Sequence, residues 1–427
     1  MHIRKIFLAT LVVLLAFFTA DAQRERNPEF EALLRENPFR AGINTDPYEG
    51  GPYANTPAPK GYKPFYISHY GRHGSRSNWD EATYKALIAS LEKADAAGIL
   101  KPEGKTVLER ARQCLEQHNG MDGRLTPRGA REHRGIAERM YKNFPDVFKK
   151  GSKNIRVISS TVPRVLISMT AFTDRLTELD PKFEISWDTG ETYQKYIDPE
   201  VVEKFNDGMM QEMGRVPWSR TDSVAYLSRF FTDWKKASEI VGRFSRFEGQ
   251  VFAVARITAS FDLEDIFPLI PEESIYNSWA RNNVSIYLGQ ANSMAFSRFR
   301  MPPALLTVKD IVDKADEVLA DQSKDALCAD LRFGHDYPFI AMCSAMGLEG
   351  IGQRLRADEI NLKWFGSNYT PFAANLQIIF YKNKKGGDVL VKFLVNERET
   401  ALMGVEPVTG PYYRWTDVRR KFTTLRY

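Results

Sequence analysis

Three segments of this chain share one order of features: a short apolar run, a charged loop and then a helical pattern. The apolar runs are residues 64–70, 155–159 and 329–333. Runs of this length and composition are typical of buried strands. Open α/β sheets bind their ligands at the carboxyl ends of such strands. The repeated order therefore predicts an α/β fold, with a central, mostly parallel sheet flanked by helices and a charged site at one edge.

A long helical stretch separates the second of these units from the third. We expect residues 179–325 to form an inserted, mainly helical lobe that closes over the site. The α/β catalytic domain is then predicted to combine residues 62–178 with residues 326–427. Apolar alternation at 376–380 and 389–394 predicts a β-hairpin within the second part.

The first 22 residues have the pattern of a secretory signal peptide. Arg4 and Lys5 precede an apolar run, which ends at the small-x-small sequence Ala20-Asp21-Ala22. The run is short for a membrane span of roughly 20 residues, so a permanent anchor is the weaker interpretation. We expect an exported protein, periplasmic or secreted. Residues 23–61 follow as an irregular N-terminal arm, because residues 48–64 are rich in Gly and Pro.

The formal net charge of the chain is mild, at +5, and falls to +4 without Arg4, Lys5 and Asp21. This charge suits a small anionic substrate and does not require nucleic acid, and a mixed charged surface explains it equally well. The three cysteines, Cys114, Cys328 and Cys343, form no disulfide framework. One pair is possible, but three small buried residues is the preferred interpretation. Neither a CxxC nor an HExxH motif supports a zinc site.

A histidine between two arginines follows the first predicted strand directly. This segment, Arg72-His73-Gly74-Ser75-Arg76, stands first in a series that continues with Leu125-Thr126-Pro127-Arg128-Gly129, Ser160-Thr161-Val162-Pro163-Arg164 and Gly334-His335-Asp336. In this order the four elements resemble the histidine acid phosphatases, the branch of the histidine phosphatase superfamily that includes phytases and multiple inositol polyphosphate phosphatases. The resemblance covers roughly residues 62–425, and the first and fourth elements are the specific ones.

The resemblance implies a phosphoglycerate mutase-like fold and a role for each matching residue. It makes His73 the nucleophile that forms a phosphohistidine. It makes Asp336 the proton donor to the leaving alcohol. It implies no metal and no cofactor. The predicted phosphate ligands are Arg72, Arg76, Arg164 and His335.

The flanking residues of the first motif fit that chemistry. His73 must be unprotonated to attack, and the neighbouring cations Arg72 and Arg76 disfavour its protonated form in mild acid. The same arginines can bind phosphate oxygens through paired hydrogen bonds. Gly74 would let the backbone come close to the phosphate. Asp336 has a second interpretation as a helix N-cap, and could serve in both roles.

Two positions indicate different subgroups of the family. His335-Asp336-Tyr337 matches the common pattern of phytases and general acid phosphatases, whereas the inositol polyphosphate phosphatase branch typically carries His-Ala-Glu there. Ser75 in the first motif, by contrast, looks like the inositol polyphosphate branch. The few cysteines differ from the disulfide-bonded fungal phytases and suggest a bacterial source.

The predicted function is an exported phosphomonoesterase that hydrolyses phytate or other inositol polyphosphates. The alternative is a broad-specificity acid phosphatase or a sugar-phosphate phosphatase on the same fold. Basic side chains beyond the predicted phosphate ligands would favour a polyphosphate. Arg128, Arg131 and Arg134 could supply them, although a solvated helix face is the preferred explanation for these three.

Two further interpretations are less favoured. A non-catalytic phosphate-binding protein is disfavoured because every matched position holds a competent residue. Export argues for a hydrolase over a phosphotransferase or mutase. The expected partner is a small anionic phosphomonoester, with no nucleic acid and, after removal of the signal peptide, no membrane. The oligomeric state is not predicted.

Overall fold

The structure is a computed structural model that describes residues 26–427 apart from 52, 200–205 and 322. The predicted signal peptide, residues 1–22, lies outside the described residues. In the described part of the chain, no helix combines the length and the apolar character needed to cross a bilayer.

One mixed sheet forms the centre of the described residues. Its strand order is β3-β2-β4-β1-β5-β6-β7, with β8 paired to β6. β1 to β4 are parallel to one another, whereas β5 pairs antiparallel with β1 and with β6. The strands are β1 Tyr62–Arg72, β2 Asn154–Ser159, β3 Glu184–Asp188, β4 Ala329–Gly334, β5 Asn375–Asn383, β6 Leu390–Val395, β7 Arg398–Glu399 and β8 Tyr413–Arg414. The predicted α/β fold with a mostly parallel central sheet is confirmed, as is the hairpin of β5 and β6.

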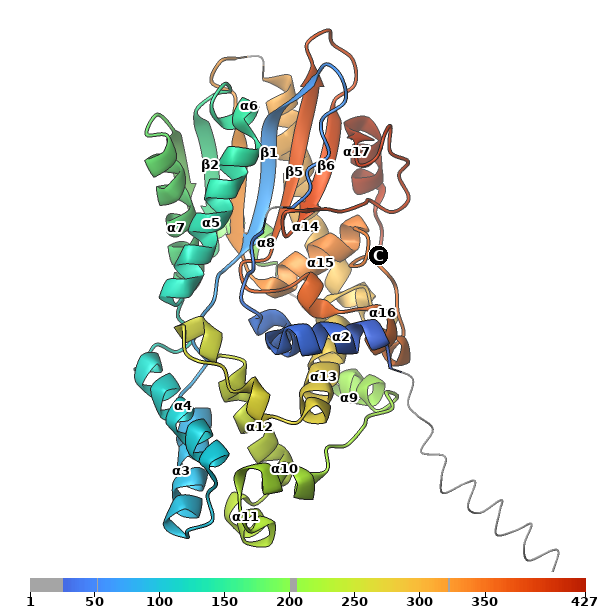
Figure 1. Cartoon of the computed structure of the whole chain (residues 1–427). Coiled ribbons are helices and arrows are strands. Elements are labelled where there is room, and N and C mark those ends of the chain that lie inside the picture. The colour runs from blue at the N-terminus through green and yellow to red at the C-terminus, as the bar shows by residue number, and fades with distance from the viewer. Residues whose placement is uncertain (1–25, 52, 200–205, 322) are drawn as a thin grey trace, which may run out of the picture.

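Helices cover both faces of the sheet (Figure 1). One face carries α5 Pro127–Asn143, α6 Pro145–Phe148 and α7 Pro163–Leu179. The other carries α14 Ser297–Ala320, α15 Asp336–Met346 and α17 Trp415–Thr424. Strand β1 serves both cores, because Tyr66 and Tyr70 pack toward α14 and α15 while Ile67 packs toward α5 and α7.

A helical lobe lies at the carboxyl ends of the parallel strands (Figure 1). Its own apolar core joins α2, α3, α4 and α10 to α13. The helices of this region are α2 Pro28–Glu36, α3 Ala82–Ala96, α4 Pro102–His118, α9 Asn206–Met213, α10 Ser223–Phe230, α11 Trp234–Val241, α12 Phe244–Ala255 and α13 Glu272–Gln290. Shorter elements complete the fold: α8 Glu191–Ile197, α16 Ile360–Lys363, η1 Pro38–Thr45, η2 Thr258–Phe261, η3 Phe267–Leu269, η4 Ala357–Glu359 and η5 Gly366–Asn368.

The N-terminal arm, expected to be irregular over residues 23–61, is helical in its first half, whereas its described residues from 46 to 61 form no helix or strand. Residues 28–45 form α2 and η1, and the Asn27 side chain caps α2 by accepting from the amides of residues 29 and 30. The sequence does indicate the start of α2, because Asn27 is a favourable N-cap and Pro28 is favourable at the first helical position. The prediction instead followed the Gly- and Pro-rich composition of residues 48–64.

Two predicted domain limits also differ from the structure. Residues 184–188, assigned to the lobe, form β3 and pair with β2 at the edge of the sheet. The side chains of β3 are mostly exposed, so this strand lacks an apolar signal. Conversely α3 and α4, assigned to the catalytic domain, pack into the core of the lobe. The division into two domains itself stays a prediction.

A buried ion network ties α14 to the sheet. Arg332 on β4 is fully buried, and its Nε donates to Asp310 Oδ2 on α14 at 2.7 Å. Arg332 also pairs with the fully buried Asp330, and Asp330 pairs in turn with Arg156 Nη1 at 2.8 Å. Removing one member of such a network leaves an uncompensated charge out of water.

We predict that Asp310→Ala lowers the free energy of unfolding by about 3 kcal/mol, since Arg332 then lacks one of its buried partners. Urea unfolding followed by circular dichroism measures this. The matched control is Asp313→Ala on the same helix, which removes only the half-exposed partner of Lys309 and should leave the unfolding curve unchanged. Equal losses in both variants would contradict a special role for the buried network.

Candidate active site

The six residues predicted for the site come together at the carboxyl edge of the sheet. The register pairs Arg72 with Gly334 across β1 and β4, so the loops that follow these strands start side by side. His73 then donates its amide to the Gly334 carbonyl at 3.0 Å. Its ring lies 5.7 Å from that of His335, centroid to centroid. Arg164 joins them from the first turn of α7.

The His73 ring is buried and has one defined tautomer. Its Nδ1 lies 2.9 Å from the Gly74 carbonyl oxygen, which can only accept a hydrogen bond. Nδ1 therefore carries the proton, and Nε2 carries the lone pair. Burial, followed by the charges of Arg72 and Arg164, holds the pKa of His73 well below its usual value. The ring is neutral in mild acid, with Nε2 available as a nucleophile.

Three arginines surround this ring. The fully buried Arg72 donates through Nη1 to the carbonyls of Thr370 and Pro371, both at 2.9 Å. Burial, followed by Arg72 and Arg164, lowers the pKa of Arg76 to about 9. The pKa of Arg164 is lowered by its burial as well. So much positive charge out of water makes this space a site for an anion.

The loop after β4 contributes His335 and Asp336. Arg164 Nη2 donates to His335 Nδ1 at 3.3 Å, so the proton of the neutral His335 ring lies on Nε2, which is 3.0 Å from Ser160 Oγ. Burial and then Arg164 lower the pKa of His335 to about 4. Asp336 Oδ2 pairs with Arg72 Nη2 at 3.3 Å. Burial favours the neutral acid, but Arg72 and the donors around it outweigh burial and hold the pKa of Asp336 below its usual value.

An exposed indole lies over two of the arginines. Trp79 is 59% exposed, and the guanidinium carbons of Arg76 and Arg164 lie 3.8 and 5.0 Å from its ring centroid. Gly123 leaves room for this ring, because a Cβ there would lie 2.9 Å from it. Trp79 thus orients two predicted phosphate ligands by cation–π contact. Trp79 is only four residues after Ser75, yet the motif gave no indication that this side chain would contact the arginines.

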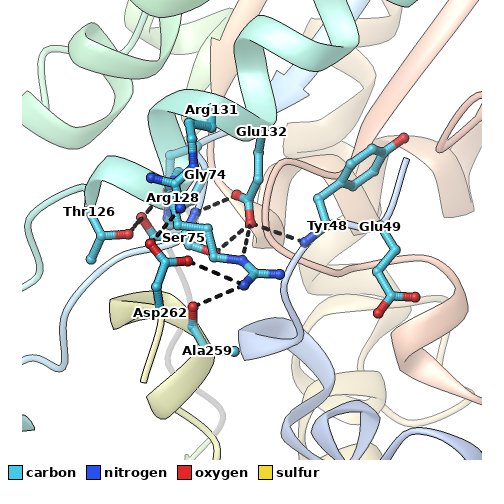
Figure 2. A network of polar contacts seen from close by, with 12 residues as sticks. Tyr48, Glu49, Gly74, Ser75, Thr126, Arg128, Arg131, Glu132, Ala259 and Asp262 are labelled. Carbon is cyan, nitrogen blue, oxygen red and sulfur yellow. Dashed lines mark hydrogen bonds and ion pairs between the residues drawn. The ribbon is translucent and has the colours of Figure 1, made fainter. Parts of the chain in front are cut away.

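A buried carboxylate fixes the loop that bears His73 (Figure 2). Glu132 on α5 accepts from the amide and hydroxyl of Ser75 at 2.8 and 2.6 Å, and from the amide of Tyr48 at 3.2 Å. Arg128, one turn earlier, lies 3.6 Å from the same carboxylate. Burial raises the pKa of Glu132, against the effect of the Ser75 hydrogen bonds. Sequence reasoning missed this residue.

The structure gives Gly74 a packing role that the sequence did not predict. The role expected from the sequence, in which Gly74 lets the backbone approach a phosphate, stays a prediction. In the structure a Cβ at Gly74 would lie 2.4 Å from the Gly129 carbonyl oxygen, and one at Gly129 would lie 2.3 Å from the Ser75 carbonyl oxygen. The two glycines therefore allow the His73 loop to pack directly on the first turn of α5. Thr126 caps that turn and also donates to the Ser75 carbonyl at 3.1 Å.

The N-terminal segment reaches the site as well. Asn44 Nδ2 donates to Asp336 Oδ2 at 2.6 Å, and the Asp46 carbonyl accepts from the Phe372 amide at 2.8 Å. Phe372 in turn contacts Arg72 and His73. No motif covers residues 44–48, and no local pattern indicates that they lie there.

The three arginines of α5 are occupied by protein partners. Arg128 and Arg131 pair with Asp262 of the lobe (Figure 2). Arg134 pairs with Glu178 of α7. They therefore connect α5 to its neighbours. This outcome is closer to the preferred explanation, a surface helix face, than to additional substrate ligands.

Three other histidines and the three cysteines are buried, and their surroundings indicate structural roles. His69 packs between Phe172 and Phe333, as expected of a packed histidine, and His133 is buried beside Phe333. His118 lies under Tyr84. The three cysteines are free and buried, which confirms the preferred interpretation. Within the described residues, no cluster of His, Cys, Asp or Glu side chains has the geometry of a metal site.

Residues 71–181 match the family model described as histidine phosphatase superfamily (branch 2). The predicted resemblance to histidine acid phosphatases is confirmed. The same match supports a phosphatase, as the sequence predicted. No protein of curated function matches the sequence.

Solved structures share the fold over most of this chain. The apo form of the multiple inositol polyphosphate phosphatase from Bifidobacterium longum superposes with a TM-score of 0.71 at 18% identity, over 89% of this chain and 97% of its own. A phytase from D. castellii gives 0.65 at 13% identity, over 91% and 85%. A phytase from Hafnia alvei, in complex with myo-inositol hexakis sulphate, gives 0.53 at 13% identity, over 87% and 98%.

We predict that Glu132→Ala lowers the free energy of unfolding by about 3 kcal/mol, because the Ser75 and Tyr48 donors lose their buried acceptor. Any catalytic activity should fall with it, since the His73 loop loses its anchor. Thermal and urea unfolding, run beside a phosphate-release assay, measure both effects. The control is Glu138→Ala on the same helix, which removes only partly exposed ion pairs with Lys142 and Arg175 and should change stability far less.

The buried histidines make stability depend on pH. Burial lowers the pKa of His133 to about 3, from the usual 6.5 that it has in the unfolded chain. Below pH 6.5 the unfolded state takes up a proton that the folded state refuses, so stability is full above this pH and declines as pH falls toward 3. We predict that His133→Leu weakens this decline by about 1.4 kcal/mol per pH unit. Urea unfolding from neutral to acidic pH measures this slope for both proteins. An equal loss of unfolding free energy with falling pH in wild type and variant would contradict the prediction.

Proposed function

We propose that this protein is an exported phosphomonoesterase that hydrolyses inositol polyphosphates such as phytate through a phosphohistidine intermediate. The observation that carries the proposal is the state of His73: a buried, neutral ring whose Nδ1 is committed to the Gly74 carbonyl, within a group of three arginines. The lone pair on His73 Nε2 and the arginines that could bind a phosphate anion therefore lie together.

In the proposed first step, the arginines bind the phosphate oxygens and His73 Nε2 attacks phosphorus in line with the departing ester oxygen. The N–P bond forms as the P–O bond breaks. Asp336 gives its proton to the leaving oxygen. Arg72, Arg76 and Arg164 stabilise the charge on the transferring group, which is where preorganised cations act most strongly.

The second step regenerates the site. Water attacks the phosphohistidine, its proton passes to the Asp336 carboxylate, and inorganic phosphate leaves His73. Asp336 is well placed to exchange a proton in both directions. With the site empty, Arg72 keeps the pKa of Asp336 low. A bound phosphate dianion would compensate the arginine charge, raise the pKa of Asp336 and so favour its protonated, donating form.

Several observations support an inositol polyphosphate as the substrate. The chain shares its fold with a multiple inositol polyphosphate phosphatase solved with inositol hexasulfate and with phytases. The lobe adds a fourth cation, Arg256, at the end of α12. It is half-buried and close enough for its charge to contribute to the lowered pKa of Arg76. A substrate with several phosphates gains from such additional positive charge.

A broad-specificity acid phosphatase is the second candidate, favoured by one observation. Arg128, Arg131 and Arg134 are paired with carboxylates, so they are not free to contact further phosphates. Export remains part of the proposal, on the strength of the predicted signal peptide in residues 1–22.

We predict that the purified mature chain releases phosphate from phytate in mild acid, with a chelator present. His73→Ala should lower the rate by at least about 10⁴-fold, since it removes the nucleophile. Asp336→Asn should lower it by about 10²–10⁴-fold, because it removes the general acid. A malachite-green phosphate assay on phytate and on 4-nitrophenyl phosphate measures all three proteins.

His118→Ala is the control, because this histidine lies under Tyr84 and outside the site. It should retain wild-type rates. Release from 4-nitrophenyl phosphate alone would support the second candidate with the same chemistry. Equal rates for wild type and His73→Ala would overturn the proposed role of His73.

A further inference from the structure

Asn44 is a polar side chain from outside the family motifs that contacts the proposed proton donor. Its Nδ2 donates to Asp336 Oδ2 at 2.6 Å, across 292 positions of sequence. The other carboxylate oxygen, Oδ1, accepts from the Tyr337 amide at 3.0 Å. With Arg72 on the same oxygen as Asn44, these contacts fix the plane of the Asp336 carboxyl group.

The backbone beside Asn44 is held in a conformation that ordinary residues avoid. Ile43 has φ 54° and ψ −85° and is fully buried in the core of the lobe. Such a conformation costs about 1–3 kcal/mol and persists only where its surroundings enforce it. Here they do: Gly366 packs so closely that a Cβ there would lie 2.6 Å from Ile43 Cγ2. The strained turn delivers Asn44 toward Asp336.

The residues that follow fix this segment to both sides of the site. The Asp46 carbonyl accepts from Phe372, and the Tyr48 amide donates to Glu132, the residue that holds Ser75 (Figure 2). One short stretch, residues 44–48, is thus bonded to the proton-donor loop at one end and to the support of the nucleophile loop at the other. A segment anchored in this way can hold Asn44 rigidly.

We infer that Asn44 is a positioning residue for Asp336, which aims the carboxyl group at the oxygen that leaves from phosphorus. The inference rests on the proposed function, because it assigns Asn44 to the proton-donating step. A purely structural role, in which Asn44 only holds the N-terminal segment in place, is the competing explanation.

Two kinetic readouts separate these explanations. The first is leaving-group dependence. An alkoxide leaves only with a proton, whereas 4-nitrophenolate leaves without one. Asn44→Ala should therefore lower kcat/KM for glycerol 2-phosphate or phytate by about tenfold or more and for 4-nitrophenyl phosphate by less than about threefold. Loss of structure would lower both equally.

The second readout is the pH profile of kcat. Asn44 donates to the ionised carboxylate, so its removal should raise the pKa of Asp336 and move the alkaline limb of the profile to higher pH. The charged groups that face Asp336 are Arg72 and Arg76 of the nucleophile loop, Arg164 of α7, the adjacent His335 and Asp198 after α8. All of them remain in the variant.

Asn37→Ala is the matched control. It removes an asparagine from the same segment, the cap of η1, whose side chain makes no contact with Asp336. It should change neither readout. Asn44→Leu, which keeps the volume of the side chain without its donor, should behave like Asn44→Ala, and melting temperatures of all variants accompany the kinetics.

The possible outcomes are distinct. Equal losses on both classes of ester with an unshifted pH profile, or unfolding of both Asn44 variants, would overturn the positioning role and leave the proposed function intact. No phosphate release by the wild-type chain from any of these esters would instead overturn the proposed function, and the inference with it. A selective loss on alkyl esters with a shifted alkaline limb supports Asn44 as positioning Asp336.

Discussion

Three guanidinium groups repel one another in one largely buried space, and the surroundings of this site must hold them together against that repulsion. Burial and mutual repulsion lower the pKa of Arg72 and Arg76, and burial lowers that of Arg164. Two of the cations are held by neutral partners: Arg76 by the Ser77 carbonyl at 2.7 Å, and Arg164 by His335 and the Trp79 ring. Arg72 donates to two backbone carbonyls and also pairs with the Asp336 carboxylate. One carboxylate does not balance three guanidinium groups, so positive charge is left for an entering anion.

The fold supplies the rigidity that this repulsion demands. The backbone of His73 is bonded to the chain on both sides, because its amide donates to Gly334 at the end of β4 and its carbonyl accepts from Ala373 before β5. Ala373 adopts a positive φ of 53° to do so. Below the loop, Glu132 and the close contact of Gly74 with Gly129 fix it to α5. The loop bearing His73 thus has little freedom to move away from its cationic neighbours.

The parts of the structure that sequence could predict are those with local signals. The cap at Thr126, the strand at residues 155–159 and the loop after residue 333 each carry their pattern in a few adjacent residues, and each was placed correctly. Asn44 and Glu132 carry no such pattern, because their partners lie 292 and 57 positions away. Edge strand β3 and the packing of α3 into the lobe were not predicted, for a related reason. The mostly exposed side chains of β3 show no apolar alternation, and the sequence around α3 does not indicate the distant residues that it packs against.

The lobe explains how one catalytic arrangement could serve a particular substrate. Its core brings Arg256 near Arg76 from α12, while Asp262 of the same lobe occupies Arg128 and Arg131. The lobe therefore supplies one positive charge that acts on Arg76 and one carboxylate that pairs with two arginines of α5. Under the proposed function, the additional charge of a substrate with several phosphates would be attracted toward Arg256. Since the loop bearing His73 is anchored to α5 independently of that cation, changes in the lobe could alter the preferred ester without disturbing the proposed attack of His73 on phosphorus.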